Sequence, residues 1–140
     1  MIVEWFFGFH RPRLRNFKGK IDARYWLGHC EAWGYNADDT WVFLDPQGRG
    51  FKIRVMHRHD EVLTQLEAYY AICESIVKIK NDEPEFDLPP FTLMSCASIC
   101  GALVNIRALM PSTLKRKLLS NGAELLHERS DHGWRIQGRS

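Results

Sequence analysis

Hydrophobic and polar residues alternate along several short stretches of the first half of the chain, a period typical of β-strands with one buried face. We expect strands over residues 2–9, 23–35, 40–44, 51–56 and 73–80. Asn36 to Asp39 predict a hairpin turn between the second and third strands, because Asn and Asp tolerate the backbone angles of such turns. The first half of the chain therefore indicates an antiparallel sheet.

Helical periods occur in three other places. Asp60 predicts the cap of a helix that runs to about Tyr69, with Val62, Leu63 and Leu66 on one face. In residues 91–106, the apolar positions 96, 99, 100, 103, 104 and 106 predict a buried helix that follows the prolines at 89 and 90.

Ser95 is the expected N-cap of that central helix. Pro111 predicts the first position of a short basic helix that continues to Ser120 and ends at residues 121–122. The tail, residues 123–136, adds one or two short strands or stays irregular. This order predicts an α+β class with an antiparallel sheet, and a single domain over residues 1–140.

The composition of the chain excludes some classes of protein and location. The chain has 140 residues, 45% of them hydrophobic and 26% charged, and its net charge of +2 is too small to indicate a specific nucleic-acid partner. The basic segment at residues 10–20 reads as a solvated loop, with an anionic partner as the alternative. The apolar N-terminus lacks a basic leader, so we expect no signal peptide, no membrane span and a cytoplasmic location.

Cysteine and histidine positions give no metal motif. The four cysteines, at 30, 73, 96 and 100, are expected to be free thiols, because their placement is irregular and no secretory signal precedes them. Cys96 and Cys100 lack the second ligand pair of a zinc site, and His57 and His59 lack a third ligand. We therefore expect no metal and no cofactor.

Cys96 is the candidate nucleophile. In the first turn after Ser95, the free backbone N–H groups and the helix dipole would favour the thiolate. The alternative is a small buried apolar residue. His29 is the candidate base and Asp45 its orienting group. If Tyr35 faces Asp39, paired residue numbers sum to 74, so that His29 faces Asp45 on one side of the hairpin. The alternative is a structural histidine near an Asp-Pro turn.

Five segments together resemble a known family: residues 28–33 (GHCEAW), 41–46 (WVFLDP), 91–96 (FTLMSC), 105–108 (NIRA) and 110–114 (MPSTL). They are similar to small papain-like cysteine hydrolases of the NlpC/P60 superfamily, and most of all to its circularly permuted branch, which includes small phage- and prophage-encoded proteins. In that branch the histidine and its polar partner precede the cysteine, as His29 and Asp45 precede Cys96 here. Met110, where a Ser or Thr cap is expected, and the extra thiols of Cys30 and Cys100 depart from the pattern.

The resemblance implies a papain-like fold in which an antiparallel sheet packs against the helix carrying the cysteine. It also implies a hydrolase of peptide or amide bonds, with a peptidoglycan peptide or another amide as substrate. Cys96 would be the nucleophile, His29 the general base and Asp45 the orienting group.

The alternative is a non-catalytic structural or docking component of a phage particle, built on the same scaffold and bound to other phage structural proteins. Its contact surface would include the basic loop and the aromatic residues Trp5, Phe6, Phe7 and Trp26.

Overall fold

A seven-stranded sheet forms the centre of the molecule. The computed structural model describes residues 1–11, 28–47, 50–82, 95–130 and 133–136. In these ranges all strand pairs are antiparallel and the strand order is β4-β3-β2-β1-β5-β6-β7. The strands are β1 (Ile2–His10), β2 (His29–Asn36), β3 (Trp41–Gln47), β4 (Gly50–Met56), β5 (Ser75–Lys80), β6 (Glu124–Ser130) and β7 (Gly133–Ile136).

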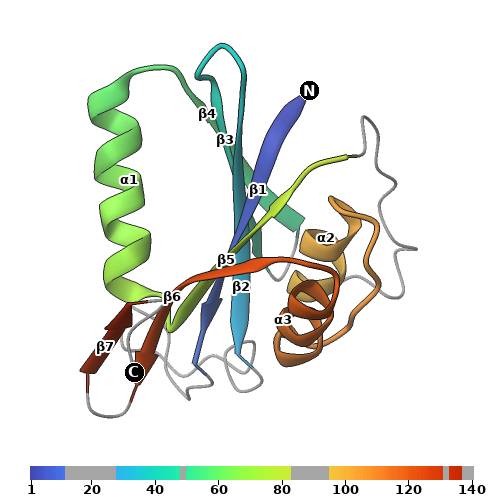
Figure 1. The fold of residues 1–140 in the computed structure, drawn as a ribbon. Helices are drawn as coiled ribbons and strands as arrows, with labels where there is room; N and C mark the ends of the chain where they lie inside the picture. Colours follow the sequence, from blue (N-terminus) through green and yellow to red (C-terminus); the bar gives the residue numbers. More distant parts are fainter. Residues whose placement is uncertain (12–27, 48–49, 83–94, 131–132, 137–140) are drawn as a thin grey trace.

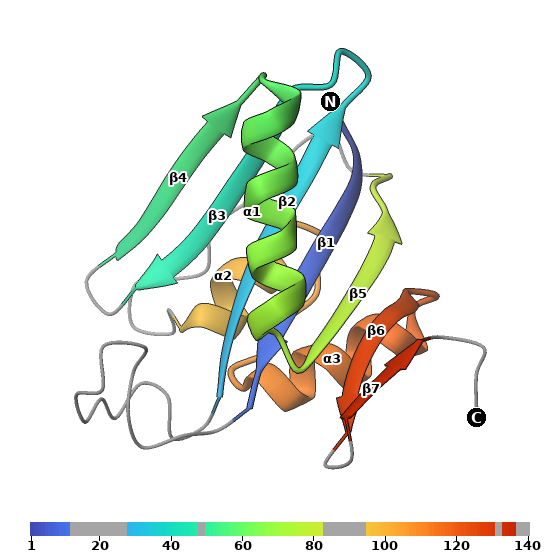
Figure 2. The same cartoon turned by 90° about the vertical axis from the view of Figure 1, so that its left-hand side faces the viewer.

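Within the described ranges, three helices cover the two faces of this sheet. Helix α1 (His59–Ile72) lies on one face, and the short helices α2 (Cys96–Ala102) and α3 (Pro111–Ser120) lie on the other (Figure 1). Figure 2 shows α1 running along the middle of its face, in front of β2 and β1. The α+β class and the antiparallel sheet expected from the sequence are confirmed.

Alternation along the strands divides the core into two parts. On β1, Phe7 and Phe9 pack in the cluster that includes the buried residues of α2 and α3, whereas Phe6 packs in the cluster below α1. In the second cluster Trp33 stacks on Tyr69 of α1, with their ring centroids 4.5 Å apart. The two faces of the sheet therefore pack against different helices.

The register of the β2–β3 hairpin differs from the expected one. Tyr35 pairs with Trp41, so paired numbers sum to 76 rather than 74. The Oδ1 atom of Asn36 accepts hydrogen bonds from the backbone N–H groups of Asp38 and Thr40, which makes the turn longer than predicted. Because the difference is two residues, every side chain stays on the predicted face.

The three helices lie where the sequence predicts them, but two of them begin or end at other residues than expected. Helix α1 begins at His59, with Arg58 rather than Asp60 in the N-cap position, and Leu63 is 43% exposed instead of buried. Helix α2 ends at Ala102, short of the expected residue 106, and the left-handed backbone of Asn105 (φ 60°) lies in the turn that follows. Helix α3 has the predicted bounds.

Three aromatic or imidazole side chains lie deeper than expected. Trp5 and Phe7 are 5% and 0% exposed, so they belong to the core and not to a contact surface. His10 is the last residue of β1 and is 5% exposed, instead of starting the basic loop, because it pairs with His29 across the β1–β2 ladder.

Several sequence predictions fall outside the described residues. They are the basic loop beyond Arg11, the start of the second strand at residues 23–27, Trp26, and the prolines at 89 and 90. Among the residues that the structure does describe, no helix is long and apolar enough to cross a membrane.

Candidate functional site

Cys96 is the first residue of α2, as the sequence predicts. Ser95 is the N-cap: its side chain accepts a hydrogen bond from the backbone N–H of Ser98, and the Ser98 side chain accepts one from the backbone N–H of Ser95. This capping box holds the start of α2 in one geometry. Because α2 packs on β2 and β3, Cys96 is carried to the strands that hold the other two candidate residues.

His29 and Asp45 are joined by a side-chain hydrogen bond of 3.1 Å between Nε2 and Oδ1. Both residues lie on the face predicted from the hairpin, although the register shift makes them diagonal neighbours rather than directly opposed ones. The His29 side chain is 10% exposed and the Asp45 side chain 34% exposed. The expected partnership between the imidazole and the carboxylate is therefore present.

Cys96 and His29 approach each other from different layers. Alternation puts His29 on the same side of β2 as Trp33, which packs below α1, whereas Cys96 belongs to α2 on the other side. His29 is the first residue of β2, and at the end of the strand its imidazole comes close enough to Cys96 for each side chain to shift the pKa of the other. The structure thus brings all three predicted residues together.

Charges around His29 favour its protonated form. Burial acts to lower the pKa of His29, but the hydrogen bonds to Asp45 and Cys96 and the negative charge of Glu31 raise this pKa to about 9. The nearer carboxylate oxygen of Glu31 lies 3.8 Å from Nε2. At neutral pH His29 is consequently an imidazolium held between a carboxylate and a thiol.

The thiol of Cys96 behaves differently from the prediction. A side-chain hydrogen bond with Cys30 and, after it, burial raise the pKa of Cys96, and these effects exceed the lowering caused by His29. The expectation of a lowered pKa at the helix start is therefore wrong, because the Cys30 thiol and burial outweigh the effect of the helix start. Cys96 is still the one partly exposed cysteine, since Cys30, Cys73 and Cys100 are all buried.

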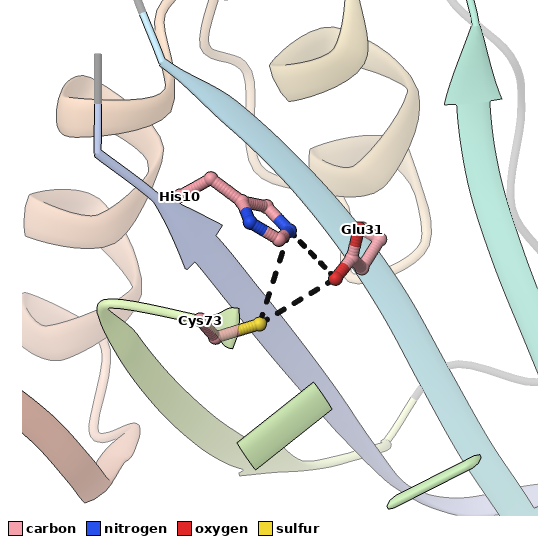
Figure 3. Close-up of side chains that lie close together, drawn as sticks. All are labelled: His10, Glu31 and Cys73. Carbon is pink, nitrogen blue, oxygen red and sulfur yellow. Dashed lines mark hydrogen bonds and ion pairs between the residues drawn. The ribbon is translucent and has the colours of Figure 1, made fainter. Parts of the chain in front are cut away.

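Glu31 belongs to the site but was not singled out from the sequence. It follows His29 by two positions on β2, so both side chains lie on one face, and this spacing is a signal that the sequence contained. One oxygen of Glu31 accepts a hydrogen bond from His10 at 2.8 Å, and Cys73 Sγ lies 3.5 Å from the same oxygen (Figure 3).

Two groups of metal-ligating side chains share this carboxylate. They are His10, Glu31 and Cys73, and His29, Glu31 and Asp45, and within each group the ligand atoms lie within 4.8 Å of one another. The sequence predicts no metal site, because His10 and Cys73 stand 21 and 42 residues from Glu31. Only the strand pairing and the end of α1 bring them together.

Comparisons of the chain with protein-family models, with curated proteins and with solved structures find no match. Function is therefore argued from the geometry of the site.

Proposed function

We propose that the protein is a cysteine hydrolase of peptide or amide bonds, with Cys96, His29 and Asp45 as its catalytic group on a papain-like, circularly permuted scaffold. The observation that carries the proposal is the convergence of these residues. The thiol at the start of α2 interacts electrostatically with an imidazole, whose Nε2 is 3.1 Å from a carboxylate oxygen.

The reaction would proceed in two steps. The Cys96 thiolate attacks the carbonyl carbon of the substrate, and the protonated His29 gives its proton to the leaving amine nitrogen, so that a thioester remains on Cys96. In the second step the neutral His29 takes a proton from water, whose oxygen attacks the thioester, so that the acid is released and the Cys96 thiolate is left beside the protonated His29 as at the start.

Two further groups would support these steps. Asp45 accepts a hydrogen bond from Nε2 of His29 and would hold the imidazole in place beside the thiol. The backbone N–H of Cys96 would stabilise the oxyanion, since N–H groups in the first turn of a helix have no partner within the helix. The proposed substrate is a peptide of peptidoglycan or another amide.

A second candidate is favoured by the raised pKa of Cys96. A thiol that keeps its proton at neutral pH and lies against Cys30 suits a non-catalytic structural component, such as a part of a phage particle. The two candidates predict different pH profiles and different effects of substitution.

Hydrolysis of peptidoglycan fragments and of generic amide substrates between pH 6 and 10 tests the proposal. We expect the rate to rise up to about pH 9, because the raised pKa of Cys96 limits the thiolate at neutral pH, and to level off there, because His29, whose pKa is about 9, loses the proton that the leaving amine needs. Cys96→Ala should lower the rate at least about 1,000-fold, and His29→Ala about 100-fold or more, with the fold kept.

Control substitutions complete the experiment. Cys100→Ala removes another thiol of α2, and His59→Gln an exposed imidazole of α1, so both should keep the activity. Wild-type protein without turnover at any pH, together with a Cys96→Ser variant that is only less stable, would contradict the hydrolase and favour the structural component.

A further inference from the structure

His10, Glu31 and Cys73 form a buried cluster on the side of the sheet that α1 covers. Their residues are 5%, 4% and 0% exposed. The three side chains come from the end of β1, from β2 and from the residue that follows α1, and Figure 3 shows them pointing toward one another. We propose that this cluster binds a zinc ion or a similar thiophilic divalent cation, through His10 Nε2, Glu31 Oε1 and Cys73 Sγ.

The distances between the three atoms fit one metal ion. Nε2 and Oε1 are 2.8 Å apart, Sγ and Oε1 3.5 Å, and Sγ and Nε2 3.9 Å. Bonds of about 2.05 Å to nitrogen, 2.1 Å to oxygen and 2.3 Å to sulfur meet at one point, roughly 0.8 Å outside the plane of these atoms. The three atoms are therefore close enough together to ligate one ion.

The chemistry of the donor set selects the cation. One thiolate, one imidazole and one carboxylate suit zinc, whereas calcium and magnesium prefer oxygen ligands alone. A tetrahedral ion would take its fourth ligand from outside these three side chains. Binding replaces the S–H bond of Cys73 by a metal–sulfur bond and releases that proton to solvent, and the hydrogen that His10 Nε2 donates to Glu31 must also leave this nitrogen, to Nδ1 or to solvent, before Nε2 can ligate.

Burial supplies the energetic reason for a cation. An ionised carboxylate and a thiolate that are buried together need more than one positive charge to compensate them, and the His29 imidazolium, 3.8 Å from the other oxygen of Glu31, supplies one. The Glu31 and His10 side chains are only 6% and 3% exposed, and the thiol of Cys73 lies against the same oxygen. A divalent ion would balance Glu31 and the Cys73 thiolate at once.

The backbone holds the three ligands in place. The N–H of Cys73 donates to the carbonyl of Tyr69, and the N–H of Glu74 donates to the carbonyl of Phe9, the residue before His10. The close approach of Cys73 to the sheet depends on Gly8, where an added Cβ would lie 2.7 Å from Sγ. A site on such rigid elements is formed before the metal arrives.

Cobalt and zinc titrations of chelator-treated protein test the site. We expect one metal ion per chain by native mass spectrometry, a thiolate-to-cobalt charge-transfer band in the near ultraviolet, and release of at least one proton per ion, from the thiol of Cys73. Cys73→Ser should abolish that band and weaken zinc binding at least tenfold. Cys100→Ser, which changes another buried thiol, should keep both.

Asp45→Asn separates this site from the second group of ligands, because Asp45 belongs only to the group with His29. We expect zinc affinity to stay within twofold of wild type. Zinc binding that is lost in Asp45→Asn, or cobalt binding to the wild type without a thiolate band, would overturn the assignment. If Cys73→Ser does not fold, the cobalt band and the number of protons released by the wild type test the site instead. A wild type that binds no metal would overturn the proposal and leave the cluster as a His–Glu ion pair.

Discussion

Replacing Gly101 by alanine should destabilise the protein at the end of α2. A Cβ at this position would overlap the carbonyl oxygen of Ile106 and lie 3.2 Å from Leu114 Cδ1. The carbonyl of Gly101 also accepts hydrogen bonds from the N–H groups of Val104 at 3.1 Å and Ile106 at 2.9 Å. The turn after α2 is therefore folded back onto a residue that has no room for a side chain.

The magnitude follows from these contacts. Overpacking of a tight site costs about 1–3 kcal/mol, and a weakened hydrogen bond adds up to about 1 kcal/mol. The higher helix propensity of alanine offsets at most about 1 kcal/mol. We expect Gly101→Ala to lower the free energy of unfolding by about 2–3 kcal/mol, which corresponds to a fall in Tm of roughly 8–10 °C for a domain of this size.

Urea unfolding followed by circular dichroism measures this loss. Gly122→Ala is the matched control: a Cβ there meets nothing within 4 Å, and only the positive φ of +94° opposes it, at a cost of about 1 kcal/mol. A Gly101→Ala variant as stable as the wild type, or no less stable than Gly122→Ala, would refute the reasoning from the close approach.

Three other outcomes follow from the site. Cys30→Ala removes the thiol that most raises the pKa of Cys96, so iodoacetamide should alkylate Cys96 faster near neutral pH, by about tenfold for each unit of decrease in that pKa; mass-spectrometric mapping that finds an unchanged rate would contradict this. In the wild type, Cys96 should be labelled before the other three thiols, because they are buried. Ser95→Ala should cost about 1 kcal/mol in urea unfolding through loss of the cap, and an unchanged midpoint would show that the cap contributes nothing.

Local patterns in the sequence are sufficient to predict the positions of most helices and strands. Alternation places β4, and Pro111 and residues 121–122 mark both ends of α3, because these signals depend on neighbours in the chain. Ser95 likewise indicates the start of α2 and the position of Cys96. Predictions fail where tertiary contacts decide, as at the end of α2, where Gly101 and Ile106 interact through their backbones.

In the candidate site, too, local patterns predict some features and tertiary contacts decide the others. The sequence predicts that paired residue numbers in the β2–β3 hairpin have an even sum, and this is enough to put His29 and Asp45 on one face. The actual register is two residues from the expected one, so the sum stays even. The side chains that surround Cys96 cannot be predicted from such a local pattern. Its pKa depends on Cys30, which comes from a strand 66 positions earlier and reaches it only after α2 packs on the sheet.

The sequence by itself determined the α+β class, the antiparallel sheet, the capped start of α2 and the three residues proposed for catalysis, because periodicity, capping and parity are local properties of the chain. The tertiary structure alone decided which charges and thiols surround those residues. Strand order joins β1 to both β2 and β5, and this order brings His10, Glu31 and Cys73 into one buried cluster. Contacts between elements far apart in the chain depend on packing in three dimensions, which no local pattern records.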